Sequence, residues 1–179
     1  DRKWINLSKN ISIMSITSKI QDSILLIRVN NDIFINLNDA GPYASKFIKR
    51  TISKFKRKFL LSISTFEADM INFFDENNNF IKPAMTGKFS AGKYLSILAN
   101  VFEAKFIIPF SSIHEYQRED SVWANDLIYP LEKYPNDIEK RHIYIKPFSY
   151  INCLKDDDIV SLDLQKKKLQ IKSPKIFGD

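Results

Sequence analysis

The chain has 179 residues, of which 44% are hydrophobic, 27% charged and 13% aromatic, and its net charge is +6. This composition is too apolar for a disordered chain and too mixed for a fibrous one, so we expect a single globular domain over residues 1–179. No run approaches the ~20 apolar residues of a membrane helix, and the N-terminus lacks the basic-then-apolar order of a secretory signal, which argues against a membrane protein and predicts a soluble, cytoplasmic one.

Three short apolar segments near the start of the chain predict a β-meander. Residues 11–16 alternate as Ile-Ser-Ile-Met-Ser-Ile, residues 24–29 form an apolar run, and residues 33–37 follow the turn-like Asn30-Asn31-Asp32. Alternation with a period of two is typical of a strand with one buried face, and Asn and Asp favour tight turns. We therefore expect three consecutive strands.

From Pro42 onward the apolar positions change to a helical period. Large apolar residues recur at intervals of mostly three to five, at Tyr43, Phe47, Ile48, Ile52, Phe55 and Phe59. Lys or Arg occupies most of the positions between them. This pattern predicts an amphipathic helix that is entered through residues 39–42, with Pro42 in its first turn and a basic face over residues 46–58.

The remaining elements alternate between strands and a helix. Residues 59–64 read as a buried strand, residues 94–102 as a second helix and residues 106–110 as a further apolar strand; residues 143–148, 159–164 and 169–172 also have strand patterns. Strands that alternate with helices indicate an α/β fold, in which helices pack on a sheet.

Several common catalytic frameworks are excluded by residue counts. The single Cys153 excludes an internal disulfide and a thiolate zinc cluster, and the four glycines form none of the glycine-rich motifs of nucleotide-binding loops or serine hydrolases. The two histidines, His114 and His142, are too few for a complete multi-histidine zinc site.

Asp39 ends the segment Asn-Leu-Asn-Asp that follows the strand at residues 33–37. Loops at the carboxyl ends of strands are where layered α/β proteins bind ligands, so Asp39 is a candidate ligand residue. The alternative is that Asn38 or Asp39 caps the following helix, where a side-chain oxygen satisfies free backbone N–H groups.

His114 lies four residues after the strand at 106–110, within a dense polar and aromatic segment that runs to Asn125. A neutral imidazole in such a place can bind a metal or act as a general acid or base. The alternative is a surface histidine paired with Glu115 or Asp120.

These segments together resemble the second half of a metallo-β-lactamase-fold hydrolase, in the branch of the lactonase-like and sialic-acid-hydroxylase-like proteins. The resemblance covers roughly residues 22–125 and rests on Asn-Leu-Asn-Asp and on Pro-Phe-Ser-Ser-Ile-His-Glu-Tyr-Gln-Arg-Glu-Asp-Ser-Val-Trp-Ala-Asn, residues 109–125. It implies a four-layer αββα sandwich with a mixed sheet and flanking helices, of which this chain is the C-terminal half.

The resemblance also implies a metal centre of one or two ions, usually Zn²⁺. Asp39 would match the bridging aspartate and His114 the final histidine, and a metal-bound water would attack an ester, lactone, amide or phosphoester of a small-molecule substrate. The family's His-x-His-x-Asp-His motif is absent from these residues. Two explanations are open: an N-terminal half upstream is the partner that completes the domain, which we favour, or this is a degenerate or split protein whose activity needs another chain. In either case we expect the chain alone to be inactive.

Side chains around this site are candidates for substrate binding. They are Tyr116, Arg118, Asp120 and Asn125. The planar guanidinium of Arg118 suits a carboxylate or phosphate, but the same group can instead pair with a neighbouring acidic residue in a structural network.

Two rival functions belong to other classes. The basic face over residues 46–58 and the run Lys166-Lys167-Lys168 could bind nucleic acid through its phosphates, although Phe47, Phe55 and Phe59 fall on the face expected to be buried. The other rival is a non-catalytic interaction module that keeps the fold without the metal.

Overall fold

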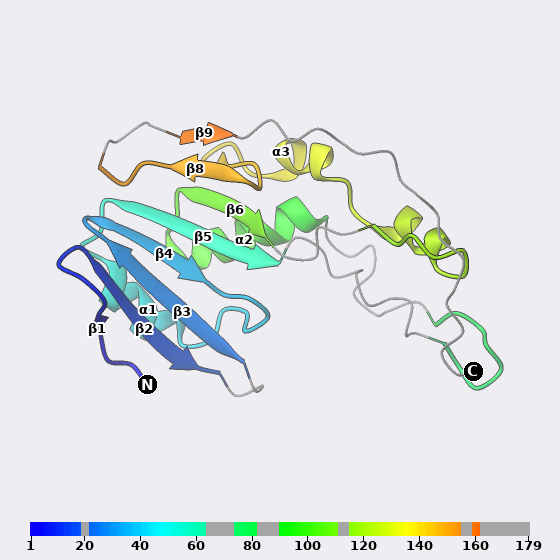
Figure 1. The fold of residues 1–179 in the computed structure, drawn as a ribbon, viewed down its shortest axis with the longest axis horizontal. Helices are drawn as coiled ribbons and strands as arrows, with labels where there is room; N and C mark the ends of the chain where they lie inside the picture. Colours follow the sequence, from blue (N-terminus) through cyan, green and yellow to red (C-terminus); the bar gives the residue numbers. More distant parts are fainter. Residues whose placement is uncertain (19–21, 64–73, 82–89, 111–114, 155–158, 162–179) are drawn as a thin grey trace.

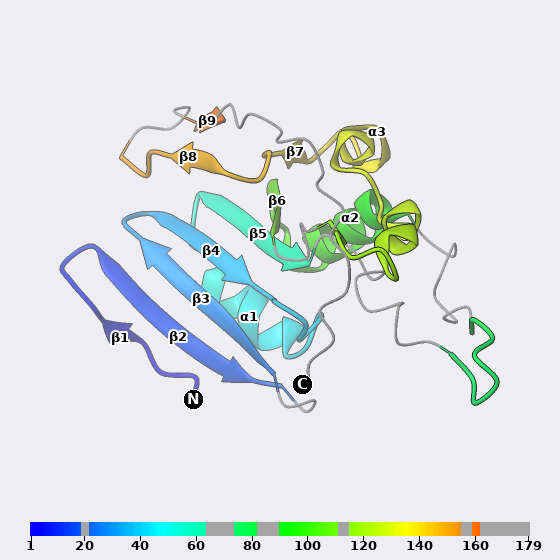
Figure 2. The same ribbon diagram turned by 45° about the vertical axis from the view of Figure 1, so that its right-hand side comes forward.

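The fold is described from a computed structural model, over residues 1–18, 22–63, 74–81, 90–110, 115–154 and 159–161. It is an α/β fold built on a seven-stranded mixed sheet, with a separate two-stranded sheet beside it (Figures 1 and 2). The elements run in the order β1 (Ile5–Asn6), β2 (Ile11–Thr17), β3 (Ser23–Val29), β4 (Asp32–Asn36), α1 (Ser45–Ile52), β5 (Arg57–Ile63), α2 (Ala91–Phe102), β6 (Phe106–Phe110), η2 (Val122–Leu127), η3 (Leu131–Lys133), α3 (Tyr134–Asp137), β7 (Ile143–Tyr144), β8 (Ser149–Ile151) and β9 (Ile159–Ser161).

The large sheet changes character at β4. Its strands lie in chain order from β1 to β7; the pairs from β1 to β4 are antiparallel, and the pairs from β4 to β7 are parallel. The predicted meander of residues 11–37 is thus confirmed as β2, β3 and β4. Each parallel step requires a crossover, and α1 and α2 supply the first two.

The main core lies between the sheet and the helices. Alternate residues of β2, β3 and β4 point to this side, among them Ile16, Leu26 and Ile35, and Ile48 of α1 and Leu95 of α2 pack against them. All five side chains are buried. The apolar residues that alternate in the sequence of these strands therefore lie on the face of the sheet that the helices cover.

The opposite face of the sheet is also apolar. Phe34, Phe59 and Phe106 from three adjacent strands stack with ring centroids 4.6 Å apart in each neighbouring pair. Ile151 of β8 and Ile159 of β9 pack against this second cluster, so the small sheet covers part of the face. Burial on both faces is what a parallel sheet requires.

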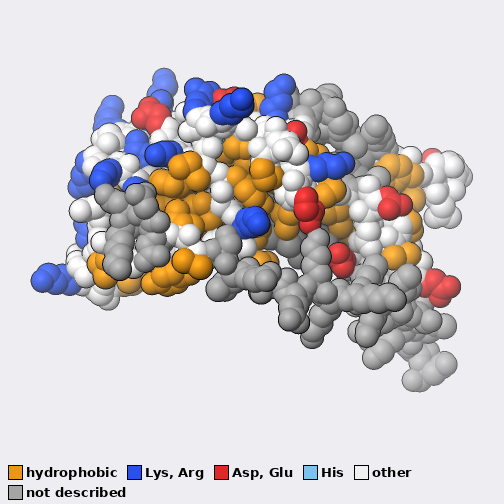
Figure 3. All heavy atoms as spheres, turned by 90° about the horizontal axis from the view of Figure 1, so that it is seen from above, with side chains coloured by type: hydrophobic (Ala, Val, Ile, Leu, Met, Phe, Trp, Pro, Cys, Tyr) orange, Lys and Arg blue, Asp and Glu red, His pale blue; other side chains and the backbone are white. Residues whose placement is uncertain are grey.

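The small sheet exposes apolar residues on its outer side. Tyr150 and Val160 are cross-strand partners and are 58% and 52% exposed, and Phe148 and Leu154 beside them are also exposed. Hydrophobic side chains form a broad patch on the side of the molecule where β8 and β9 lie (Figure 3). Exposed apolar area of this kind marks interaction surfaces.

The helix expected from Pro42 through Phe59 is shorter than predicted. Residues 41–44 form turns, and α1 spans only Ser45–Ile52. The prediction failed because Phe55 and Phe59 continue the helical spacing, whereas residues 57–63 also alternate as a strand. Pairing of Arg57 with Asp32 of β4 decides the outcome, so the basic face over residues 46–58 does not exist as one helix.

The other predicted elements are confirmed to differing extents. The strand at 59–64 is β5, the helix at 94–102 is α2, which begins at Ala91 behind the cap Ser90, and the strand at 106–110 is β6. The strand at 143–148 is wrong beyond Tyr144, because Pro147 lacks an N–H and Phe148 adopts a positive φ of 61°. Residues 162–172, which hold two predicted strand segments, lie outside the described residues.

Within the described ranges, none of the helices has the length and apolar character that crossing a membrane would demand.

Candidate functional site

The candidate site is the edge of the sheet at which β4, β5 and β6 end. These three strands are parallel neighbours, so their carboxyl ends meet on one side of the sheet. Asp39 follows β4 by three residues. His114 follows β6 by four residues in the sequence and lies outside the described residues.

Asp39 sits in a turn that Asp22 holds in place. One carboxylate oxygen of Asp22, Oδ2, accepts a hydrogen bond from the Asp39 N–H at 3.1 Å and another from the Asn38 Nδ2 at 3.2 Å. The Asn38 N–H donates to the side chain of Asn36, and Asn38 has a positive φ of 44°, a conformation that Asn tolerates well. No described residue bonds to the carboxylate of Asp39, which is exposed.

The capping role considered for Asn38 or Asp39 is wrong. The residue that precedes α1 is Ala44, which has a left-handed backbone and makes no side-chain cap hydrogen bond. Residues 40–44 separate Asp39 from the first turn of α1. The Asp39 carboxylate therefore has no helix-capping function that would explain its position.

Asp22 was not identified from the sequence, although the hairpin register could have found it. Leu25 pairs with Asn36 in the antiparallel β3–β4 ladder. Continuing this register three residues outward places position 22 opposite position 39. The turn therefore carries two carboxylates, one that holds the backbone and one that faces solvent.

Asn125 organises the segment after β6. Its Oδ1 accepts from the Tyr116 N–H at 2.7 Å, and its Nδ2 donates to the Tyr116 carbonyl oxygen at 2.8 Å. The amide thus mimics a β-ladder partner and ties the extended residues 115–117 to η2. Both polar atoms of the Asn125 side chain are used in this way, and Tyr116 is half-buried.

Arg118 pairs with Asp120 in a two-pronged ion pair, which is the structural alternative considered from the sequence. Its Nε and Nη2 lie 3.1 and 2.7 Å from the two carboxylate oxygens, and both side chains are about half exposed. The Trp123 indole N–H donates to the Asp120 carbonyl oxygen at 2.9 Å, and its ring contacts Phe74 and Phe80 edge to face. Aromatic rings from residues 74–81 and from η2 therefore meet beside this ion pair.

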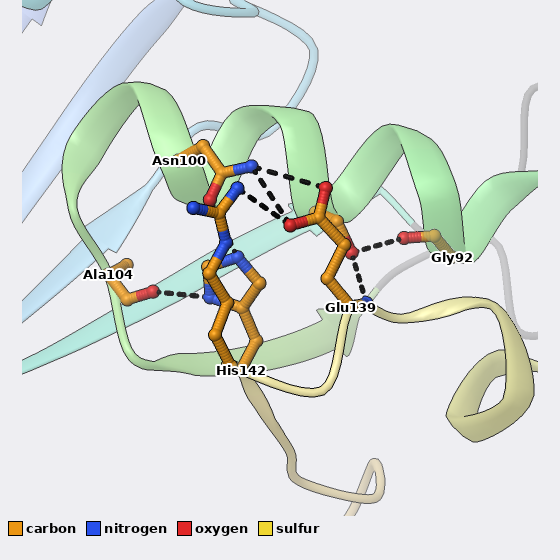
Figure 4. Close-up of polar contacts among 7 residues, drawn as sticks. Gly92, Asn100, Ala104, Glu139 and His142 are labelled. Atoms are coloured by element: carbon orange, nitrogen blue, oxygen red, sulfur yellow. Dashed lines mark hydrogen bonds and ion pairs between the residues drawn. The ribbon is translucent and has the colours of Figure 1, made fainter.

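A second polar cluster joins α2 to the segment before β7 (Figure 4). The two ring nitrogens of His142 lie 2.9 Å from the Ala104 carbonyl oxygen and 2.9 Å from Oδ1 of Asn100, whose Nδ2 donates to Glu139. Burial acts to raise the pKa of Glu139, but the bonds from Asn100 and Arg141 and the His142 charge lower it overall. His142 therefore holds structure in this cluster and is not available as a ligand.

Asp32 and Arg57 form a buried ion pair at the opposite end of β4 and β5. Arg57 Nε lies 2.8 Å from Asp32 Oδ1, Nη2 also contacts the carboxylate, and the side chains are only 7% and 4% exposed. Arg57 also donates to the Asn152 carbonyl oxygen. Burial, together with the Asp32 charge and hydrogen bond, raises the pKa of the Cys153 thiol to about 11, which favours the protonated thiol at neutral pH.

Some cations of the basic face considered for nucleic acid are paired with acidic side chains. Lys49 and Lys58 both pair with Glu103, at 3.0 and 3.6 Å, which lowers the pKa of this carboxyl. Arg57 is buried in its ion pair, and Phe55 and Phe59 are buried as expected. Lys166-Lys167-Lys168 lies outside the described residues. The basic face is therefore divided between a short helix, a buried ion pair and two lysines that pair with Glu103.

The described residues do not complete a metal site. No three His, Cys, Asp or Glu side chains among them come together as a metal ion requires. The free, exposed carboxylate of Asp39 has the donor chemistry that zinc accepts, but a zinc site needs three or four such ligands. No family model and no curated protein matches this chain.

Proposed function

We propose that the chain is part of a metal-dependent hydrolase of the metallo-β-lactamase fold, in which this mixed sheet is one of the two sheets of a four-layer αββα sandwich. The parallel order of β4, β5 and β6 carries the proposal, because the carboxyl ends of β4 and β6 lie at one edge of the sheet, and in the sequence Asp39 follows the first and His114 the second. Asp39 and His114 would be metal ligands, and the N-terminal half of the domain would supply the others.

The free carboxylate supports the assignment of Asp39. Asp22 fixes the turn through backbone and amide hydrogen bonds, which leaves the oxygens of Asp39 without a described partner. A carboxylate between two cations would stay ionised and fix their spacing. When bound, Zn²⁺ would lower the pKa of a water molecule so that it attacks an ester, lactone, amide or phosphoester.

The substrate-binding residues of the proposal follow β6. Arg118 and Asp120 are half exposed, so a substrate anion could recruit the guanidinium from its partner. Tyr116 and Asn125 would act by holding the shape of this segment, since the Asn125 amide bonds to the main chain of Tyr116. The substrate would be a small molecule.

The test measures zinc in the product of the whole reading frame that contains these residues. We expect the Asp39→Asn variant to bind zinc at least about tenfold more weakly, the scale seen when a residue that supports a metal site is lost, and to lose hydrolysis of a test lactone. His114→Asn should behave in the same way. The matched control is Asp75→Asn, which keeps its turn because Asn can accept the same backbone hydrogen bonds. Normal zinc content and rate in both site variants would refute the assignment.

A further inference from the structure

The ring of His142 is held between two hydrogen-bond acceptors. Its Nδ1 lies 2.9 Å from the Ala104 carbonyl oxygen, and its Nε2 lies 2.9 Å from Oδ1 of Asn100 (Figure 4). Both oxygens can only accept a hydrogen bond, whereas a neutral imidazole carries a proton on only one of its two nitrogens. Either neutral form therefore satisfies one contact and turns a lone pair toward the other oxygen. The doubly protonated ring satisfies both.

Glu139 determines which atom of the Asn100 amide faces the ring. Asn100 Nδ2 lies 3.4 and 3.5 Å from the two carboxylate oxygens of Glu139. Turning the amide over would bring its oxygen to the carboxylate, and neither group could then donate. Glu139 is itself fixed, because its N–H donates to Ser96 Oγ at 3.0 Å and Arg141 pairs with its carboxylate at 2.6 Å. Through the amide, the carboxylate thus selects the protonated ring.

The surroundings of the ring also suit a cation. His142 meets the C-terminal end of α2, where the helix dipole favours positive charge. The charged groups of the described residues around it are Glu103 at the end of α2, Lys105 at the start of β6, and Glu139, Lys140 and Arg141 of its own segment. Glu103 pairs with two lysines of other elements, and Arg141 is engaged by Glu139. The anion that acts on the ring through the amide is therefore Glu139.

His142 directly precedes β7, so its contacts hold this strand at the edge of the sheet. The Ile143 N–H donates to the Lys105 carbonyl oxygen at 2.8 Å, and the Ile145 N–H donates to that of Ile107 at 2.9 Å. The strand has only two residues, and the Ile145 side chain is buried in the cluster on the face opposite the helices. A strand with so few ladder bonds opens locally at low cost, so each additional contact matters.

We propose that His142 is a pH-sensitive latch: the doubly protonated ring fastens β7 to α2 and β6, and the loss of one ring proton to water releases β7 from β6. The ring is half-buried, so water can take this proton. Histidine titrates near neutral pH, so β7 is held most firmly in mildly acidic solution and is released as the pH rises. The latch lies at the amino end of β6 and does not involve the candidate metal site at the carboxyl end.

The test measures hydrogen exchange of the Ile143 and Ile145 amides in the full chain by NMR, at about pH 5.5 and about pH 8, on either side of the usual histidine titration. Each rate is divided by that of an unstructured peptide at the same pH, which removes the pH dependence of the exchange chemistry. We expect the protection of both amides to fall at least about tenfold over this range, the scale of one lost hydrogen bond to a charged group, while the amides of β3 keep theirs. Unchanged protection, or an equal fall in β3, would overturn the inference.

Glu139→Gln is the variant that separates a latch from a purely structural contact. It keeps the length of an exposed side chain but allows the Asn100 amide to turn over and donate to a neutral ring. Most of the pH-dependent fall in protection should therefore disappear. The matched control is Glu76→Gln, which removes an exposed carboxylate from the turn at residues 75–79 and should keep the whole fall. A complete fall in Glu139→Gln would contradict the latch.

Nitrogen-15 NMR of the ring connects the strand to the proton. In a His114→Gln background, His142 is the one histidine of the sequence, so its ring signals need no further assignment. The signals of the doubly protonated ring and the protection of Ile143 should be lost over the same pH range. A neutral ring beside a fully protected Ile143 would refute the proposal. This measurement leaves all groups of the latch unchanged, so it remains decisive if Glu139→Gln fails to fold.

Discussion

The buried ion pair of Asp32 and Arg57 provides the sharpest test of the energetics of this fold. The Arg57→Met variant replaces the guanidinium with an apolar side chain of similar length. It thereby removes both hydrogen bonds to Asp32 and the one to the Asn152 carbonyl oxygen. It leaves a carboxylate in a site where only 4% of the Asp32 side chain is exposed. Removing one partner of a buried ion pair costs about 3–5 kcal/mol.

A matched control is available in the same chain. Arg118 and Asp120 have the same two-pronged geometry, but both side chains are about half exposed. Solvent screening reduces such a pair to about 0–1 kcal/mol, so Arg118→Met should change stability little. The comparison isolates burial, because residue types and hydrogen-bond geometry are shared.

The assay is urea unfolding followed by both circular dichroism and tryptophan fluorescence. With a slope of about 2 kcal/mol per molar, Arg57→Met should lower the midpoint by about 1.5–2.5 M. The double variant Asp32→Val with Arg57→Met should be more stable than Arg57→Met alone, because no charge remains buried. A cost below about 1 kcal/mol for Arg57→Met, or additive costs in the double variant, would refute the reasoning.

Two further predictions concern other parts of the core. Burial, with a contribution from the Glu132 charge, raises the pKa of Tyr144 to about 12. The stability that depends on the neutral phenol is therefore complete below about pH 10, the pKa in the unfolded chain, and is lost as the pH rises toward 12. The Tyr144→Phe variant should therefore show a smaller fall in urea midpoint between about pH 9 and pH 11. An unchanged slope would contradict this. Gly92→Ala should destabilise by about 1–3 kcal/mol despite a better helix propensity, because the new Cβ would lie 2.7 Å from the Cβ of Asp137. A raised melting temperature would show that α3 can move away.

Much of the sheet could be predicted because its strands carry their own periodic signal. In residues 11–16 and 24–29, every second side chain along part of the strand is buried. The short turn at Asn30-Asn31 favours antiparallel pairing of β3 with β4. The end of α1 could not be predicted from local pattern. Phe55 and Phe59 fit both a helix and a strand, and the choice depends on Asp32, 25 residues before Arg57.

The candidate site was predictable only in part, for a similar reason. The sequence predicts a carboxylate, Asp39, after a strand. The hydrogen bond from the Asp39 N–H to Asp22 depends on the register of the β3–β4 hairpin, which the sequence pattern around Asp39 does not show. Asn125 was expected near a substrate, yet both atoms of its amide bond to the main chain of Tyr116, which sequence spacing does not reveal. Side-chain hydrogen bonds to distant backbone are tertiary features and leave no periodic trace.

The change from antiparallel to parallel pairing at β4 has a consequence for synthesis of the protein. The β2–β4 meander is complete once residue 36 has left the ribosome, whereas the parallel ladder of β4, β5 and β6 must wait for residue 110. At typical translation rates of about 5–20 residues per second, this delay lasts about 4–15 seconds. During that time the nascent meander holds Ile, Leu and Phe side chains that later elements cover in the folded chain. We therefore expect aggregation during synthesis to begin at this meander when later elements are delayed.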